Sequence, residues 1–375
     1  MHLWPTSANI LLALSSALVI HAYPSAYSQA RAPTNSGLAR RATTCNGHAE
    51  LCDRSYGNVT FVGAHDSYAV GVNNLAVNQD HDITTQLNDG IRMLQMQAHL
   101  QDGNIRLCHT SCGLYDGGLL ADYLKTVKTW LDANPNEVLS LLIVNSDNRA
   151  AAEYDTVFKS VGLDAVSFAP ETPTLPASGW PTLGSMIDSG KRLVTFLDNA
   201  ADPSIPYLLD EFTNIWETAF NVIDPNFDCV VNRTKGDPST QMYLINHFLD
   251  KLVFNQPVPD IDNANQTNSA TGLGSLGTHV QTCTTDHFRP PNFLLVDFYE
   301  YGGGSVFQVA ADVNGVPYTP ATPIARPITS STGSTSSSTA SGNSASPIGS
   351  VHSRGHLLAC LIVIAGMAFG PYLLL

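Results

Sequence analysis

Two histidines and two aspartates in this sequence stand where predicted strands end. His65 and Asp66 follow one short apolar run, His109 follows another, and Asp297 ends a third. An imidazole titrates near neutral pH, and a neighbouring carboxylate fixes its tautomer. If one edge of a sheet gathers these four groups, they suit general acid–base catalysis.

Five further polar residues occupy the same kind of position. Gln95, Gln97 and His99 alternate along one predicted strand, so their side chains share a face. Asn145 and Asp198 directly follow two other strands. We expect all five to line the site and to bind its ligand. The simpler interpretation of His99 is a hydrogen-bonded structural residue, and the alternative is that it supplies positive charge to the ligand.

The predicted strands are short runs rich in Val, Ile, Leu and Phe that alternate with helical stretches. This alternation is typical of parallel strands covered on both faces. Eight such runs favour an α/β fold built as a single distorted (β/α)8 TIM barrel, with its active site at the C-terminal ends of the strands. The predicted strands are 59–64, 91–97, 105–108, 138–144, 193–197, 215–219, 293–298 and 306–309.

Two helices are predicted most clearly, at 119–134 and 241–254. In the second segment, apolar residues recur at helical spacing and would form one buried face. The barrel as a whole is expected to span 42–317.

Composition and charge limit the classes of partner. The chain has 375 residues, of which 43% are hydrophobic and 13% are charged, as in a globular protein. Its net charge is −14, and all 32 acidic residues lie between Glu50 and Asp312. So acidic a domain repels phosphate backbones and anionic head groups, which disfavours a nucleic-acid partner or a polybasic membrane-surface role. Nothing marks an oligomer interface, so we expect a monomer.

The N-terminal segment is typical of an exported protein. An early apolar run that ends near small residues predicts a signal peptide at 1–22. The following segment, 23–41, is polar and closes with Arg40 and Arg41. We interpret it as a propeptide removed after the dibasic pair, and the alternative is a linker that stays in place.

The C-terminal segment predicts a lipid anchor. Residues 318–343 are dense in Ser, Thr and Pro, which is typical of a glycosylated stalk. Residues 344–375 combine a polar spacer with a terminal apolar run, the layout of a glycosylphosphatidylinositol (GPI) attachment signal that is removed. Asn343 is the expected attachment site, with Ser341 or Gly342 as alternatives. We therefore expect a GPI-anchored protein at the cell surface or cell wall, and a retained transmembrane helix is the alternative.

Cysteine usage agrees with export. Removing the tail removes Cys360 and leaves six cysteines, and proximity along the chain favours pairs that leave no free thiol. The expected disulfides are Cys45–Cys52, Cys108–Cys112 and Cys229–Cys283. Three sequons, at Asn58, Asn232 and Asn265, would mark surface positions if they are glycosylated.

Four short segments resemble a known family. They are 62–68 (VGAHDSY), 90–92 (GIR), 107–109 (LCH) and 293–298 (FLLVDF). They resemble the catalytic X region of phosphatidylinositol-specific phospholipase C, and more narrowly its secreted fungal members, the PLC-like phosphodiesterases. The resemblance extends over residues 45–309 and implies a distorted TIM barrel.

The resemblance also implies a role for each of the four catalytic candidates. His65 matches the general base that takes the proton of the inositol 2-hydroxyl, and His109 matches the general acid that protonates the departing lipid oxygen. Asp66 would assist His109, and Asp297 would orient His65. In-line attack on a phosphodiester needs such a base on one side of the phosphorus and an acid on the other.

Two positions depart from the family. At the places of Gln95 and Gln97, bacterial relatives carry an aspartate and an arginine, and calcium-dependent relatives carry carboxylate ligands. A glutamine amide brings no formal charge, and charge-assisted hydrogen bonds are about twice as strong as neutral ones. No metal or other cofactor is therefore expected, and the alternative is calcium held by Asp66 with amide oxygens.

Two function classes follow. The first is an exported phosphodiesterase that acts on an inositol lipid or a related phosphodiester without metal. The second is a catalytically weak or inactive cell-surface barrel that uses the same pocket to bind a polyol, a glycan or a phosphate-bearing ligand. A glycosidase would need two facing carboxylates, and Asp198 with Asp297 or Glu300 is a weak candidate pair.

Overall fold

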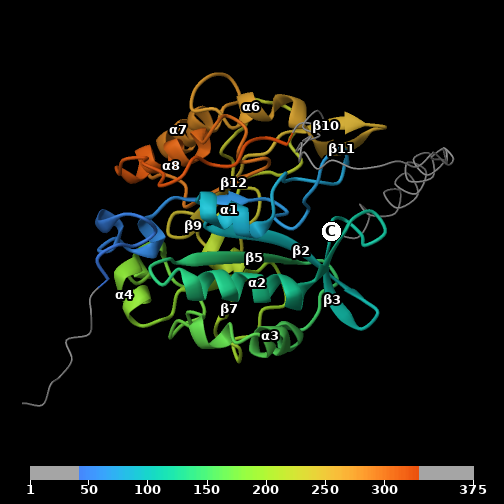
Figure 1. Cartoon of the computed structure of the whole chain (residues 1–375). Helices are drawn as coiled ribbons and strands as arrows, with labels where there is room; N and C mark the ends of the chain where they lie inside the picture. The colour runs from blue at the N-terminus through green and yellow to red at the C-terminus, as the bar shows by residue number, and fades with distance from the viewer. Residues whose placement is uncertain (1–41, 329–375) are drawn as a thin grey trace, which may run out of the picture. The chain divides into compact units, whose positions relative to one another are not determined.

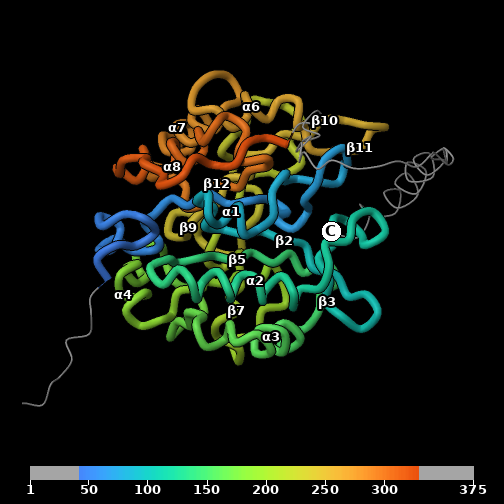
Figure 2. The backbone as a smooth tube through the Cα atoms, in the orientation of Figure 1, coloured from blue at the N-terminus to red at the C-terminus, as the bar shows by residue number. Residues whose placement is uncertain are grey.

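Eight parallel strands carry the candidate residues. The computed structural model describes residues 42–328 (Figures 1 and 2). Around the sheet, the strands lie in the order β7–β6–β5–β2–β1–β12–β9–β8. Their bounds are β1 Phe61–Ala64, β2 Met93–Gln101, β5 Leu139–Asn145, β6 Leu193–Leu197, β7 Leu208–Asp210, β8 Ile215–Glu217, β9 Met242–Asn246 and β12 Phe293–Val296.

The sheet curls into the predicted distorted TIM barrel, with one open seam. β12 returns to pair with β1, from Phe61 opposite Phe293 to Ala64 opposite Val296. Within the described residues, the edge strands β7 and β8 are not hydrogen bonded to each other, and the short helix α5 (Glu211–Asn214) joins them instead. The barrel is therefore closed on the side of β1 and open between β7 and β8.

The two faces of the strands bury two separate hydrophobic clusters. Along β1, Phe61 belongs to the cluster inside the barrel, whereas Val62 and Ala64 belong to the cluster shared with the helices. The inner cluster stacks Phe61 on Phe293, with ring centroids 5.8 Å apart. Both faces of a strand are thus buried, which explains why the strands are nearly continuous apolar runs.

Helices cover the outside of the barrel. Figure 1 shows α2 and α3 on one side of the sheet and α7 and α8 on the other. The side chains of Asp82, Thr182 and Ser275 cap α1, α4 and α7 by accepting a backbone N–H from the first turn. The helices are α1 Ile83–Asp89, α2 Leu120–Ala133, α3 Ala151–Ser160, α4 Leu183–Asp188, α6 Ala264–Thr267, α7 Leu276–His287 and α8 Ser305–Asn314. Short 3-10 turns are η1 Ala49–Leu51, η2 Tyr56–Asn58, η3 Asp164–Val166, η4 Ala177–Gly179 and η5 Ile261–Asn263.

Two antiparallel additions extend the C-terminal edge of the barrel. β2 runs beyond the barrel and pairs with β3 (Asn104–Cys108), which in turn pairs with β4 (Asp116–Leu119). After β9, the chain forms the hairpin of β10 (Asp250–Val253) and β11 (Gln256–Pro259). The predicted strand at 105–108 is therefore present, but it runs antiparallel and lies outside the ring of eight.

Two predicted elements are wrong. The segment 306–309, predicted as a strand, lies inside α8, where Val306, Val309 and Ala310 are buried at helical spacing. The segment 241–254, predicted as a helix, forms β9 and then β10. All five side chains of β9 are buried, so the strand shows no alternation that would distinguish it from a buried helix. The helix predicted at 119–134 is confirmed as α2.

The three predicted disulfides are confirmed. Cys45 is bonded to Cys52, Cys108 to Cys112 and Cys229 to Cys283. The first lies near the N-terminal edge of the barrel, the second follows β3, and the third ties the loop after β8 to α7.

Loss of Cys229–Cys283 should cost more stability than loss of Cys45–Cys52. The two bridges span sequence separations of 54 and 7, and a crosslink that closes a longer loop restricts the unfolded chain more. Replacing both Cys229 and Cys283 by alanine should lower the free energy of unfolding by about 3–5 kcal/mol. Denaturant titration measures the loss, and the matched Cys45→Ala/Cys52→Ala variant should lose about 2 kcal/mol less. Equal losses would contradict the loop-length argument.

Several predicted segments lie outside the described residues. They are the signal peptide (1–22), the propeptide (23–41), the stalk beyond 328, and the attachment signal (344–375) with its site at Asn343.

The described start of the predicted stalk is hydrogen bonded to the barrel. The Ala325 N–H donates to Asp89 Oδ2 (3.0 Å), and the Ile328 N–H donates to Asp80 Oδ2 (2.7 Å). No helix between residues 42 and 328 combines the length and the apolar character that a membrane span requires.

Candidate active site

The four catalytic candidates come together at the C-terminal edge of the barrel. His65 and Asp66 directly follow β1, Asp297 directly follows β12, and His109 follows β3. β1 and β12 are neighbouring parallel strands, and β3 pairs with the extension of β2. Loops at this edge of a TIM barrel hold the chemistry in this class of fold.

Asp297 and Asn78 fix the orientation of His65. His65 Nδ1 lies 2.9 Å from Asp297 Oδ1. Asn78 Nδ2 donates to both oxygens of Asp297, at 3.2 and 3.1 Å. With Nδ1 engaged by this carboxylate, His65 presents Nε2 to the site.

The surroundings of His65 make it a strong base. Its ring stacks on Phe248, with centroids 3.8 Å apart and an interplanar angle of 5°. Burial alone would lower the pKa of His65, but the charges of Asp297 and Asp66 outweigh burial and raise that pKa to about 9. The free protein therefore holds His65 as an imidazolium at neutral pH.

His109 is fixed through its backbone and its ring. His109 Nδ1 lies 2.9 Å from the Ala76 carbonyl oxygen, so this nitrogen carries the proton and donates. The His109 backbone N–H donates to the Tyr115 carbonyl, and the Cys108–Cys112 disulfide closes the adjoining loop. His109 Nε2 is left facing the site, as in His65.

Both histidines face the same carboxylate. Asp66 Oδ2 lies 3.9 Å from His65 Nε2 and 3.7 Å from His109 Nε2. Asp66 is fully buried, and its other oxygen, Oδ1, has no hydrogen-bond partner among the described residues. Its backbone has a positive φ of 36°, a conformation that is strained for a residue other than glycine and is often found at functional sites. The acid–base pair therefore flanks one buried negative charge.

Gln95 and Gln97 hold this carboxylate. Gln95 Oε1 accepts the backbone N–H of Asp66 at 2.6 Å. Gln97 Nε2 donates to Asp66 Oδ2 at 3.1 Å, and Gln97 Oε1 accepts the backbone N–H of Thr110, next to His109, at 3.1 Å. The glutamines predicted to bind the ligand thus also position Asp66 and the His109 loop.

The other predicted ligand residues form hydrogen bonds at neighbouring strand ends. His99 Nδ1 lies 3.3 Å from Asp147 Oδ1, on the part of β2 that extends past the barrel. Asn145 Oδ1 accepts from the Tyr154 hydroxyl at 2.8 Å, and the Asn145 N–H donates to Asp198 Oδ1 at 2.8 Å. These contacts give His99, Asn145 and Asp198 structural partners, and within residues 42–328 none of their side-chain hydrogen bonds reaches the four catalytic candidates.

The weak glycosidase pairing gains no support. Burial raises the pKa of Asp198, and its Oδ1 accepts two hydrogen bonds from Asn145 and Asn199. Both carboxylate oxygens of Glu300 are buried without a hydrogen-bond partner among residues 42–328. Neither carboxylate is hydrogen bonded to Asp297, whose partners are His65 and Asn78.

Several residues of the site were not predicted from the sequence. Asn78 and Gln79 come from the long loop after β1, and Gln79 Nε2 ties the carbonyls of His65 and Val296 together. Phe248 was assigned to a helix, but it lies in the loop after β9. Short polar loop residues carry no periodic signal, so only residues directly after strands could be identified.

A second charged group lies near the seam of the barrel. Arg233 forms an ion pair with Glu217, at the end of β8, and its guanidinium lies 4.5 Å from the centroid of Phe220. Burial and the charge of Glu217 raise the pKa of Glu211 well above its usual value. No local pattern predicts this group, because its members come from three separate segments.

The residues around Asp66 fit calcium poorly. Hard cations prefer several carboxylate oxygens, and here the amides of Gln95 and Gln97 are already bonded to Asp66 and Thr110. Elsewhere in the described part of the chain, ligand atoms of Cys229, His279 and Cys283 lie within 4.8 Å of one another. The two cysteines are disulfide bonded, so they offer no thiolate to a metal.

Comparisons with known proteins give the family of the chain. The family model described as PI-PLC X 1 matches residues 51–314. Two proteins of Arthroderma benhamiae are each 47% identical to this chain. The one named "Uncharacterized secreted protein" matches over 73% of this chain, which spans 64% of that protein's length. The one named "PI-PLC X domain-containing protein 1" matches over 72% of this chain and 90% of its own length.

Among solved structures, the phosphatidylinositol-specific phospholipase C from Listeria monocytogenes is similar, with a TM-score of 0.49 and 16% identity, over 70% of this chain and 95% of that one. The family model, in contrast, covers well over half of the sequence. On that ground the chain belongs to the PI-PLC X family.

Proposed function

We propose that this protein cleaves phosphodiesters by acid–base catalysis without metal, with His65 as the general base and His109 as the general acid. The observation that carries the proposal is the placement of both Nε2 atoms on one buried carboxylate, each with its Nδ1 engaged by a fixed partner. Two imidazoles held in this way can serve the two sides of one phosphorus centre.

The proposed reaction uses one histidine on each oxygen. Nε2 of neutral His65 takes the proton of the attacking hydroxyl, whose oxygen forms the new bond to phosphorus. Nε2 of protonated His109 donates a proton to the leaving oxygen as its bond to phosphorus breaks. Asp297 stabilises the imidazolium that forms on His65, and Asp66 keeps a negative charge beside His109.

An inositol phospholipid or a related phosphodiester is the proposed substrate class. Membership of the PI-PLC X family supports it. Export is proposed from the predicted signal peptide, the three disulfides and the relative named as a secreted protein. We further propose that the C-terminal signal attaches a GPI anchor at Asn343, and that Asn58, Asn232 and Asn265, which are exposed, carry glycans.

One observation favours the second candidate function, a barrel that binds a ligand without efficient turnover. Gln95 and Gln97 stand where bacterial relatives carry charged residues, and both are bonded to Asp66. A neutral amide stabilises the charge of a phosphorane-like transition state less well than a guanidinium does.

Turnover in the presence and absence of metal should separate these proposals. The secreted protein is expected to cleave phosphatidylinositol or a soluble inositol phosphodiester at the same rate with calcium and with an excess of chelator. Product release is measured for both substrates, because a lipid aggregate and a soluble ester differ in access to the site. Loss of turnover in chelator would contradict the metal-free mechanism, and no turnover under any condition would favour the binding protein.

A further inference from the structure

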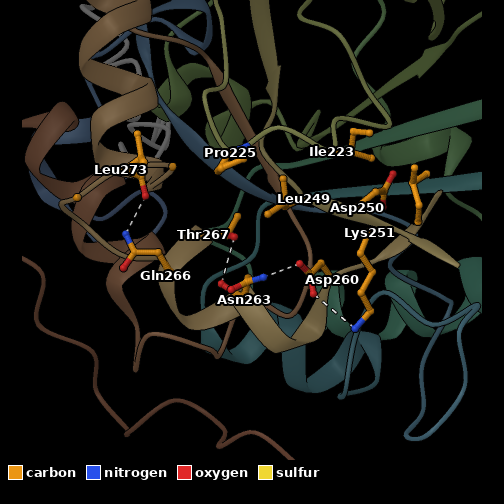
Figure 3. A pocket seen from close by; sticks show the side chains of 13 residues that line it. Ile223, Pro225, Leu249, Asp250, Lys251, Asp260, Asn263, Gln266, Thr267 and Leu273 are labelled. Carbon is orange, nitrogen blue, oxygen red and sulfur yellow. Dashed lines mark hydrogen bonds and ion pairs between the residues drawn. The ribbon is translucent and has the colours of Figure 1, made fainter.

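A cavity of about 780 Å³ is lined by the side chains drawn in Figure 3. Three chain segments line it, and all of them follow the C-terminal ends of β8 and β9. The segments are 223–225, 249–252 and 260–274. The cavity therefore lies on the edge of the barrel that also carries His65, but it is built from different loops.

One wall of this cavity carries a buried carboxylate with no partner. Asp250 lines the cavity and is 7% exposed. In the part of the chain that the structure describes, its backbone N–H is bonded to Val222, but its side chain takes part in no hydrogen bond or ion pair. Burying a carboxylate without a hydrogen-bond partner costs free energy, which a ligand that pairs with it would offset.

The carboxylates around Asp250 favour the binding of a cation. Burial and the charges of Asp297 and Asp260 raise its pKa to about 7, and His65 opposes the rise. The neighbouring ammonium of Lys251 is already engaged, by Asp260 at 3.5 Å and by Asp262. No hydrogen bond or ion pair joins His65 to Asp250 in the described residues, so this carboxylate can still pair directly with a ligand cation.

The remaining polar groups of the cavity include two side-chain amides. Asn263 Nδ2 donates to Asp260 Oδ2 at 2.6 Å, and Gln266 Nε2 donates to a backbone carbonyl at 3.0 Å. The side-chain oxygens of these two amides accept no hydrogen bond from the described residues, and Figure 3 shows both amides on the cavity wall. A ligand with several hydrogen-bond donors can therefore bond to both oxygens.

The same cavity has an apolar wall. Ile223, Leu249, Leu252 and Leu273 line it, and three of them are more than half exposed, at 52% for Ile223, 51% for Leu252 and 69% for Leu273. Exposed apolar side chains beside acceptor groups suit a molecule with a hydrocarbon face and several hydroxyl groups.

We propose that this cavity binds a sugar that carries a primary amine. Its ammonium pairs with Asp250, its hydroxyl groups donate to the oxygens of Asn263 and Gln266, and its C–H face packs on the leucine side chains. The residues of this site differ from those of the proposed catalytic site, and binding here does not require catalytic activity.

Two contacts connect the cavity to the catalytic residues. Phe248, which stacks on His65, directly precedes the wall residues Leu249 and Asp250. The second contact is made by Asn268, which directly follows the wall residue Thr267. Its Nδ2 donates to the carbonyl oxygen of Asp297 at 2.9 Å. An occupant would therefore lie against the two segments that support the His65–Asp297 pair.

Calorimetric titration of the full secreted protein with glucosamine tests the proposal. Binding is expected at pH 7.5, and Asp250→Asn should weaken it by about tenfold or more, because the variant keeps the shape and loses the charge. N-acetylglucosamine, which lacks the ammonium, should bind at least about tenfold more weakly than glucosamine. At pH 5.5 the parent protein should also bind more weakly, since Asp250 is then protonated.

Control measurements on three variants test whether a change in glucosamine binding is specific to Asp250. Asp132→Asn changes an exposed carboxylate on α2 and should leave glucosamine binding unchanged. Asp250→Asn should unfold at no lower temperature than the parent, because it removes a charge without a partner. His65→Ala should still bind glucosamine, so failure of the catalytic proposal and failure of this one are distinguishable.

Three results would overturn the proposal. They are no binding at millimolar glucosamine, equal binding by Asp250→Asn, and equal binding of N-acetylglucosamine. The protein is also titrated with calcium alone. Tight calcium binding that is lost in Asp250→Asn would identify a metal site and would contradict the proposal of an amino-sugar site.

Discussion

Replacing either His65 or His109 by alanine should lower kcat/KM for a phosphodiester by about 10²–10⁴-fold. Each substitution removes one proton transfer, and His65 and His109 are the cationic side chains that pair with Asp66 Oδ2 in the described residues. Because both histidines act in one transition state, the double variant should lose less than the product of the single losses.

Steady-state kinetics on a soluble inositol phosphodiester measures these losses. His48→Ala is the matched control, since His48 lies in the Cys45–Cys52 loop, where Asn46 is bonded to Val138 just before β5, at the opposite edge of the barrel. The control should keep full activity. A loss of less than about tenfold in His109→Ala would show that another group protonates the leaving oxygen.

One limb of the pH profile of kcat/KM should have its midpoint near pH 9. His65 must be neutral to accept a proton, and the carboxylates of Asp297 and Asp66 raise its pKa to about 9. Because His109 must be protonated at the same time, turnover depends on both histidines, and the midpoint near pH 9 is the one that reports His65.

Asp297→Asn should move this midpoint to lower pH. The substitution removes the negative charge that lies 2.9 Å from His65 Nδ1, so the imidazolium loses stabilisation and the pKa of His65 falls. The maximal rate should fall as well, because the carboxylate no longer orients the ring. Rates measured from pH 5 to pH 10 give both quantities. A parent profile without a midpoint near pH 9, or a midpoint there that Asp297→Asn does not move, would show that His65 is not the base.

The barrel could be predicted from the sequence, but its eight strands were not all identified correctly. The count included 105–108, which is an antiparallel addition, and 306–309, which is part of a helix. It missed β7, which has three residues, and β9, whose side chains are all buried. Periodicity alone cannot distinguish a strand buried on both faces from a buried helix, and it gives little signal over three residues, so the fold class was easier to predict than the individual strands.

The candidate site was predictable to the extent that its residues directly follow strands. His65, Asp66 and Asp297 do so, and their convergence follows from the parallel order of β1 and β12. Asn78 and Phe248 come from loops whose path depends on tertiary packing. Alternation along β2 correctly placed Gln95 and Gln97 together, but only coordinates could show that both bond to Asp66.

The Cys108–Cys112 bridge links the proposed chemistry to the compartment in which the protein folds. It closes the turn that begins at His109, so the acid belongs to a small covalent ring. Such a ring forms where the surroundings oxidise thiols, and it stays open in a reducing cytosol. Before oxidation, a newly made chain would carry the base, His65, directly after strand β1, and the acid, His109, in a loop that no disulfide closes. Under the proposed function, oxidation on the export route completes the enzyme, so the phospholipids that face the reducing cytosol do not meet its completed form.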